Sequence, residues 1–409
     1  MQRRRWWLSW AAIWALGGCP RMVDDGATGS DETMRAQTGG ADSSSDTAGA
    51  TLSDEGEDTA APETSGAMCE DACPHAPGVG VGCQRRFMFG LNYAWHHFGG
   101  DFGGIAAWNQ RGVSGNVEAI RADLRAMKME AGANVIRWWM FPDFRGDGVV
   151  LDEAGIPTGL GGTALADIEQ ALVLAEEEDV YLMLTLFSFD TFRSELDEQP
   201  IASLQPLVID AGGRTALLEQ VVRPVAAAVA ASPHRARMVA WDVINEPEWA
   251  IEGPSPYGDE DYTPNIEEGR LLVTHAQMET FLAETIAVLR EESDALVSIG
   301  AASFKWARAW KNLDTDFHQF HMYDWIDEWW PHANPPANYD LGDKPVVMGE
   351  FPLAGLASAP LPTMLENWWH AGYAGALGWA YSDPTFNTPD GLAGMKAFAD
   401  ARACEVAYD

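Results

Sequence analysis

From about residue 86 onward, the chain alternates short apolar runs with longer segments of helical periodicity. Eight runs have the length and composition of strands, and the run at 180–187 is apolar at nearly every position, as in a strand covered on both faces. The predicted strands are 86–94, 134–140, 180–187, 238–244, 295–300, 317–323, 345–350 and 375–381.

Helical periodicity fills most of the gaps between these runs. In 116–131, Val117, Ile120, Leu124 and Met127 fall on one face, and Asn116 stands where a helix cap belongs. The other predicted helices are 163–178, 215–231, 271–292, 363–371 and 392–404. Eight predicted strands that alternate mostly with helices over roughly 325 residues predict an α/β fold, a (β/α)8 TIM barrel, rather than a doubly wound sheet.

The first 19 residues have the pattern of a targeting signal. Arg3, Arg4 and Arg5 precede an apolar stretch at 6–16 that is too short for an ordinary membrane span. Leu16-Gly17-Gly18-Cys19 resembles a bacterial lipoprotein processing box, so Cys19 is the predicted lipidation site. The alternative is a plain secretory signal in which Cys19 has no role.

Composition separates the next segment from the rest of the chain. Residues 20–67 are rich in Ser, Thr, Gly and acidic residues, and a segment that buries so little apolar surface is predicted to be a disordered linker. Residues 68–409 then form the predicted catalytic domain. The localisation this organisation predicts is extracytoplasmic, as a bacterial cell-surface or outer-membrane lipoprotein or as a secreted protein.

Charge narrows the choice of partners. The formal net charge of −35 argues against binding to nucleic acid or anionic lipid, and it suits an uncharged partner. We therefore expect membrane association only through a lipid anchor at Cys19, and a monomer.

Four further cysteines are present: Cys69, Cys73, Cys83 and Cys404. An even number in an exported protein favours two disulfides, and three connectivities are possible. Pairing of one N-terminal cysteine with Cys404 would join the two ends of the domain. A zinc site is a weaker interpretation, because His75 is the only histidine near the first three cysteines.

Two predicted strands end in a glutamate that a proline follows at once or one residue later. The run at 238–244 leads into Asn245-Glu246-Pro247, and the run at 345–350 ends at Glu350, before Phe351-Pro352. Barrel enzymes hold their chemistry at the carboxyl ends of strands. Hydrolysis of a glycosidic bond with retention requires one carboxylic acid and one carboxylate, about 5–5.5 Å apart. Glu246 and Glu350 are therefore the candidate catalytic pair.

These motifs, Trp-Asp-Val-Ile-Asn-Glu-Pro and Val-Val-Met-Gly-Glu-Phe, resemble signatures of clan A glycoside hydrolases, most closely family 5. That family contains cellulases and β-mannanases that fold as (β/α)8 barrels and retain anomeric configuration. The resemblance implies that Glu246 is the acid/base and Glu350 the nucleophile, and that Asn245 binds the sugar 2-hydroxyl. No cofactor and no metal are expected.

The resemblance also extends to four other positions. It implies that Arg137 pairs with the nucleophile, that Tyr323 bonds the nucleophile while His321 lies on the acid side, and that Trp379 lies under the sugar. Trp95 and Trp249 are further candidates for sugar binding. They belong to a set expected on loops around the barrel mouth: Trp95, His96, His97, Trp108, Trp139, Trp249, Trp325, Trp329 and Trp330.

One departure leaves the substrate open. Where the family commonly has a histidine near the end of strand three, this chain reads Phe187-Ser188-Phe189-Asp190. The favoured function is a retaining β-glycosidase acting on a neutral polysaccharide or oligosaccharide, of the endo-β-1,4-mannanase kind. The alternatives are a β-glucanase or cellulase, or an inactive barrel that only binds carbohydrate. Transglycosylation would use the same residues.

Overall fold

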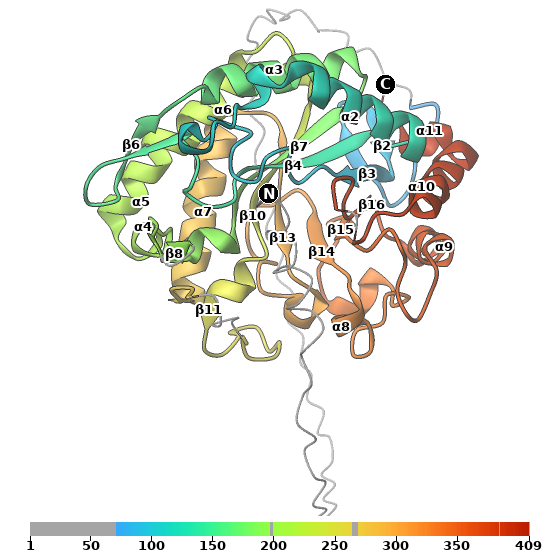
Figure 1. Cartoon of the computed structure of the whole chain (residues 1–409). Helices are drawn as coiled ribbons and strands as arrows, with labels where there is room; N and C mark the ends of the chain where they lie inside the picture. Colours follow the sequence, from blue (N-terminus) through green and yellow to red (C-terminus); the bar gives the residue numbers. More distant parts are fainter. Residues whose placement is uncertain (1–70, 197–198, 264–268, 384, 409) are drawn as a thin grey trace, which may run out of the picture. The chain divides into compact units, whose positions relative to one another are not determined.

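Eight parallel strands form a closed barrel in a computed structural model that describes residues 71–196, 199–263, 269–383 and 385–408 (Figure 1). The predicted signal segment and linker lie outside these residues. The barrel strands are β3 (Met88–Asn92), β4 (Val135–Phe141), β7 (Tyr181–Ser188), β10 (Met238–Asn245), β13 (Leu296–Ala301), β14 (His318–His321), β15 (Val346–Glu350) and β16 (Gly375–Gly378). Each strand pairs with the next along the chain, and β16 pairs with β3, so the predicted barrel is confirmed.

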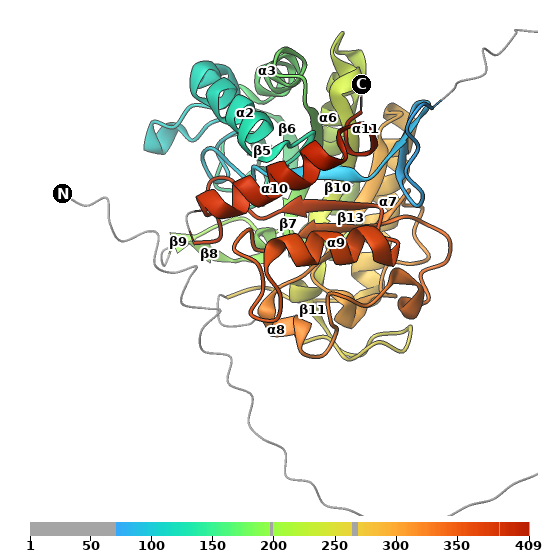
Figure 2. The same ribbon diagram turned by 90° about the vertical axis from the view of Figure 1, so that its right-hand side faces the viewer.

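Helices lie around the outside of the strands (Figures 1 and 2). They are α2 (Val117–Ala131), α3 (Ala164–Glu177), α4 (Gln205–Ile209), α5 (Ala211–Leu217), α6 (Arg223–Ala231), α7 (His275–Glu292), α8 (Asp324–Asp327), α9 (Leu361–Ala371), α10 (Pro389–Ala401) and α11 (Ala403–Val406). Ile120, Leu124 and Met127 of α2 are buried against the barrel, as their periodicity predicts.

Two details of the predicted helices are wrong. Residues 215–231 are not one regular helix, because α5 passes through a π-helical turn, Leu218–Val222, into α6; Pro224 has no backbone N–H to continue the regular ladder. Asn116 precedes α2 but does not cap it, because its side-chain amide donates to the carbonyls of Arg111 and Gly112.

Outside the barrel there are also short two-stranded sheets, which the apolar pattern does not predict. They are β1 (Val79–Val81) with β2 (Gln84–Arg86), β5 (Val149–Leu151) with β6 (Pro157–Leu160), β8 (Glu195–Leu196) with β9 (Gln199–Pro200), and β11 (Ile251–Glu252) with β12 (Val273–Thr274). Each has only two to four residues per strand, which is too short to show a period.

The start and the end of the described domain are joined covalently. Cys73 and Cys404 form a disulfide whose Cα atoms lie 5.7 Å apart, across 331 residues of sequence. Cys83 is also disulfide-bonded. Buried Arg86 donates to Asp71 and to the carbonyl of Ala407 beside this link. The disulfides fit an oxidising, extracytoplasmic compartment and exclude a zinc site that uses Cys73.

No helix in the described part of the chain is both long and apolar enough to cross a membrane.

Inside the barrel, apolar residues from the first halves of the strands pack together, among them Met88, Val135, Met183, Ala240 and Val347. The polar interior begins near the middle of the strands, at Arg137 of β4 and Asp242 of β10.

Candidate active site

Glu246 and Glu350 lie at the carboxyl ends of β10 and β15, which β13 and β14 separate in the barrel. Glu350 is the last residue of β15, and Glu246 follows β10 directly. Glu246 has a left-handed backbone conformation, φ 49° and ψ 51°, and its N–H donates to the carbonyl of Gly300 at 2.6 Å. Both side chains are almost completely buried.

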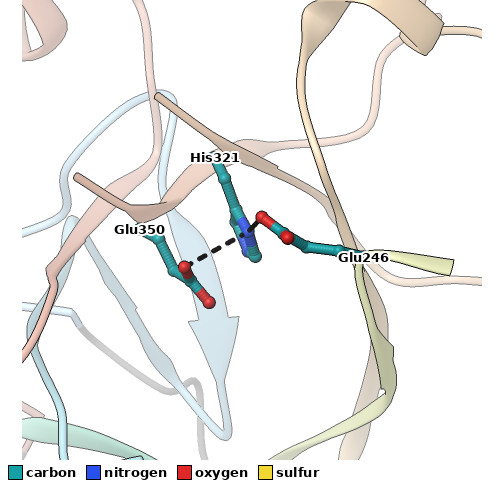
Figure 3. Close-up of side chains that lie close together, drawn as sticks. All are labelled: Glu246, His321 and Glu350. Atoms are coloured by element: carbon teal, nitrogen blue, oxygen red, sulfur yellow. Dashed lines mark hydrogen bonds and ion pairs between the residues drawn. The ribbon is translucent and has the colours of Figure 1, made fainter. Parts of the chain in front are cut away.

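His321, at the end of β14, stands between the two carboxyl groups (Figure 3). Its Nδ1 lies 2.7 Å from Oε1 of Glu246 and 3.4 Å from Oε2 of Glu350. One oxygen of each glutamate and one ring nitrogen all lie within 4.8 Å of one another. The spacing of the carboxyl groups therefore belongs to the short range of retaining glycosidases, not to the longer range of about 6.5–9.5 Å of inverting ones.

Glu350 is held by two partners that favour its ionised form. Nη1 of Arg137 lies 2.5 Å from Oε1, and the hydroxyl of Tyr323 donates to Oε2 at 2.9 Å. Arg137 is fully buried, and it also forms an ion pair with Asp242, at 2.7 Å. One arginine between two carboxylates leaves this part of the site with a net negative charge.

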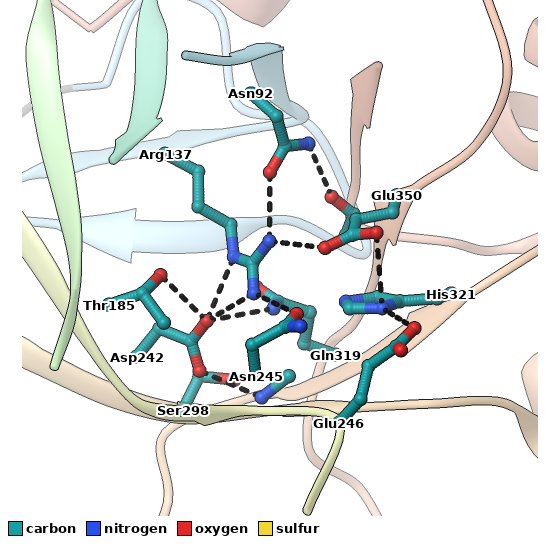
Figure 4. Close-up of polar contacts among 12 residues, drawn as sticks. Asn92, Arg137, Thr185, Asp242, Asn245, Glu246, Ser298, Gln319, His321 and Glu350 are labelled. Carbon is teal, nitrogen blue, oxygen red and sulfur yellow. Dashed lines mark hydrogen bonds and ion pairs between the residues drawn. The ribbon is translucent and has the colours of Figure 1, made fainter. Parts of the chain in front are cut away.

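The remaining donors of Arg137 are also used (Figure 4). Nη1 donates to Oδ1 of Asn92 and Nη2 to Oδ1 of Asn245, both at 2.8 Å. Asn245 therefore presents its amide Nδ2 away from the arginine. A side chain at Gly300 would not fit here, because a Cβ would stand 2.8 Å from Nη2 of Arg137.

Burial changes the proton affinity of all three central groups. It raises the pKa of Glu246 to about 8, and the hydrogen bond from Trp249 and the charge of Arg137 only partly oppose this. Burial also raises the pKa of Glu350, but the charge of Arg137 and the hydrogen bond from Tyr323 oppose this. Burial lowers the pKa of His321 to about 4, so this ring is neutral at neutral pH. Since only Glu350 has a direct arginine partner, Glu246 is the member of the pair that carries a proton near neutral pH.

Three tryptophans gather on the side of the site near β16, β3 and β4. Trp379 follows β16, Trp95 follows β3, and Trp139 belongs to β4. The ring centroid of Trp139 lies 5.4 Å from those of both Trp95 and Trp379, which are themselves 6.0 Å apart. The prediction that Trp139 lies on a loop is wrong, because it is part of β4. Its position two residues after Arg137 on the strand, and therefore on the same face, was the available signal.

Trp249 borders the site on the opposite side. Its Nε1 donates to Oε2 of Glu246 at 2.9 Å, and its ring contacts Trp325 at 5.4 Å. The other tryptophans of the predicted set differ in exposure: Trp329 is 69% exposed and Trp108 is 45% exposed, beside Arg145. Of the two histidines of the set, His96 contacts Tyr93 and Asp123 of α2, and its ring lies 4.5 Å from that of His97.

Glu246, His321 and Glu350 are close enough to bind a metal ion. Their carboxyl oxygens already have protein partners, because Arg137 and Tyr323 bind Glu350 while His321 and Trp249 bind Glu246. The donor set therefore fits the acid and nucleophile of a hydrolase better than a metal centre.

Asp242, Asn92 and Asp190 are site residues that the sequence interpretation did not assign. Asp242 also accepts from Thr185, and its other oxygen accepts from the N–H of Gly300. Asp190 lies just after β7, near the position at which the family commonly has a histidine. It is buried, and Arg193 forms an ion pair with it at 2.9 Å. Its charge contributes to the raised pKa of Glu246.

Comparison with known proteins agrees with this architecture. No family model matches the chain. It is 24% identical over 359 residues to the mannan endo-1,4-β-mannosidase of Cryptopygus antarcticus, which covers 78% of this chain and 88% of that protein. Its fold is similar to that of the β-mannanase of the blue mussel Mytilus edulis, with a TM-score of 0.65 and 22% identity over 83% of this chain and 99% of that one. It is also similar to GH5_18 from Bifidobacterium longum subsp. longum, with a TM-score of 0.51 and 15% identity over 79% of this chain and 81% of that one. The chain is thus similar to β-mannanases in sequence and in fold, and its fold is shared with a GH5_18 protein.

Proposed function

We propose that this protein is a retaining endo-β-1,4-mannanase that uses Glu246 as acid/base and Glu350 as nucleophile. The observation that carries the proposal is the short distance between two buried carboxyl groups that have opposite surroundings. Glu350 has an arginine and a tyrosine as partners, whereas Glu246 has a neutral histidine and an indole N–H.

The reaction follows from these surroundings. Glu350 attacks the anomeric carbon while Glu246 gives its proton to the departing glycosidic oxygen, so the bond to the leaving sugar breaks as a glycosyl–enzyme ester forms. Glu246, now ionised, then removes a proton from water, which attacks the same carbon and releases Glu350. Arg137 and Tyr323 keep Glu350 ionised and aligned before attack.

Substrate contacts follow from the polar and aromatic groups around the pair. Because Oδ1 of Asn245 accepts from Arg137, its Nδ2 is the group that donates to the sugar 2-hydroxyl. Trp379 offers a ring face to the sugar at the point of cleavage. The names of the relatives favour mannan as the polymer, and the strongly acidic chain suits a neutral substrate.

Attachment to a membrane through lipidated Cys19 is part of the same proposal. Its support is the sequence Leu16-Gly17-Gly18-Cys19. Detergent-phase partitioning of the full chain expressed in a bacterium, beside a Cys19→Ala variant, distinguishes a lipoprotein from a secreted protein.

The first experiment is release of reducing sugar from mannan, glucomannan, cellulose, mixed-linkage glucan and xylan, with Glu350→Gln as the matched inactive variant. We expect release from mannan and glucomannan, with at least about a thousandfold loss in the variant. Release from cellulose or mixed-linkage glucan alone would make the protein a β-glucanase. Binding without release, equal in both proteins, would make it a carbohydrate-binding barrel. Proton NMR of the first product decides between retention and inversion.

A further inference from the structure

A third carboxyl group, that of Glu248, is buried two residues after Glu246. It is fully buried, and both of its oxygens accept hydrogen bonds: Oε2 from the N–H of Ala302 at 3.0 Å and Oε1 from Nε1 of Trp310 at 2.6 Å. Because Glu248 is fully buried, it has no exposed surface at which a glycosidic oxygen or a water molecule could meet it. Its role is therefore not that of a second acid.

Both donors belong to the segment that follows β13, the strand next to β10 in the barrel. Trp310 is itself held, because its ring stacks on His275 at the start of α7 with centroids 5.0 Å apart and an interplanar angle of 4°. Glu248 thus fastens the short helical turn η6 (Pro247–Ala250) to a rigid neighbour.

The same turn controls both sides of Glu246. At its start, Glu246 has a left-handed backbone, which costs a non-glycine residue roughly 1–2 kcal/mol and persists only where other contacts enforce it. At its third residue, Trp249 donates to Oε2 of Glu246, and its ring is fixed edge-on against Trp306. If the turn moves, the acid loses both its backbone position and its side-chain donor.

We propose that Glu248 is a positioning residue for the general acid: its two hydrogen bonds hold the turn that aims Glu246 at the glycosidic oxygen. This inference rests on the proposed function of Glu246. It goes beyond that function because it assigns a specific step, protonation of the leaving group, to a residue that does not touch the substrate.

The test is dependence on the leaving group in Glu248→Gln. A glutamine keeps the size of the side chain but turns an N–H2 group toward one of the two donors. Breaking a polysaccharide bond requires protonation by the acid, whereas release of dinitrophenolate does not. We expect kcat/KM on the polysaccharide that the wild type cleaves to fall at least about tenfold. On the dinitrophenyl β-glycoside of the same sugar, kcat/KM is expected to stay within about threefold.

Two further variants complete the experiment. Trp310→Phe removes one donor of Glu248 and keeps the ring that stacks on His275, so it is expected to reproduce the same selective loss. Glu252→Gln changes an exposed carboxyl group in the same loop, on β11, and is expected to leave both rates unchanged.

The outcomes separate the possible failures. Equal losses on both substrates in Glu248→Gln and Trp310→Phe would mean general damage to the fold, and full activity on both would mean that the turn needs no such anchor; either result overturns the inference. If Glu248→Gln does not unfold cooperatively, the selective loss in Trp310→Phe decides. A wild type inactive on every substrate would refute the proposed function itself.

Discussion

Replacement of Glu246 by glutamine should stabilise the protein at alkaline pH, although it should abolish catalysis. Burial raises the pKa of this carboxyl group to about 8, from 4.5 for an unperturbed glutamate. Between these two pH values the folded wild type retains a proton that the unfolded chain has released. The free energy of unfolding of the wild type therefore falls as pH rises through this window.

Glutamine carries no titrating proton, so the variant does not lose this stability. At about 1.4 kcal/mol per pKa unit, the difference between variant and wild type should grow by at most about 5 kcal/mol from pH 4.5 to pH 8 and then stay constant. At the acidic end of the window both proteins hold a neutral group at this position, and the difference is expected to be small. The side chain of glutamine still reaches Nδ1 of His321.

Urea-induced unfolding at about pH 5 and about pH 8.5 measures this difference, with Glu252→Gln as the control that should parallel the wild type. The pH dependence of kcat/KM of the wild type tests the pKa of Glu246 independently. We expect kcat/KM to decline above about pH 8, as Glu246 ionises. A constant difference between the variant and the wild type at both pH values would refute the conclusion that Glu246 is held protonated by burial.

Two further predictions test the supports of the site. Arg137→Lys keeps one positive charge, but a lysine cannot reach Asp242, Glu350 and Asn245 together. We therefore expect the free energy of unfolding at neutral pH to fall by about 3–5 kcal/mol and kcat to fall at least about a hundredfold. Activity within tenfold of the wild type would contradict the role given to the arginine. The double substitution Cys73→Ser, Cys404→Ser removes a disulfide that spans 331 residues, and the free energy of unfolding in chemical denaturation is expected to fall by about 2–5 kcal/mol. We expect kcat/KM to stay unchanged, because the disulfide is remote from the carboxyl pair. A selective loss of kcat would show that the disulfide also shapes the site.

The apolar pattern predicts all eight barrel strands because each is a local feature. Strand limits are less well predicted at the ends that matter for chemistry. The runs predicted at 317–323 and 375–381 end as strands at His321 and Gly378, so Tyr323 and Trp379 lie just beyond them. Their apolar character continues past the last ladder hydrogen bond because the barrel mouth is itself lined with aromatic residues.

In the candidate site too, some residues can be predicted from local sequence and others cannot. Glu246 and Glu350 are recognisable because each stands at an abrupt end of an apolar run near a proline. Asp242 stands in the same motif without any such mark, and Asn92 lies 45 residues from Arg137 in sequence. Neither can be assigned before the barrel closes, because contacts across its interior depend on how the strands are staggered around the ring.

The residue order alone is sufficient for the fold class, the order of the strands and the two carboxyl groups, since hydrophobic periodicity and strand-end motifs involve only residues close in sequence. Which carboxyl group keeps its proton is decided by the tertiary structure. Arg137 from β4 and Tyr323 after β14 meet Glu350, while Glu246 is desolvated beside a neutral histidine. Desolvation and charge pairing are properties of the assembled barrel, because they arise from atoms that lie 27, 75 and 213 residues apart in sequence and that folding brings within 3 Å.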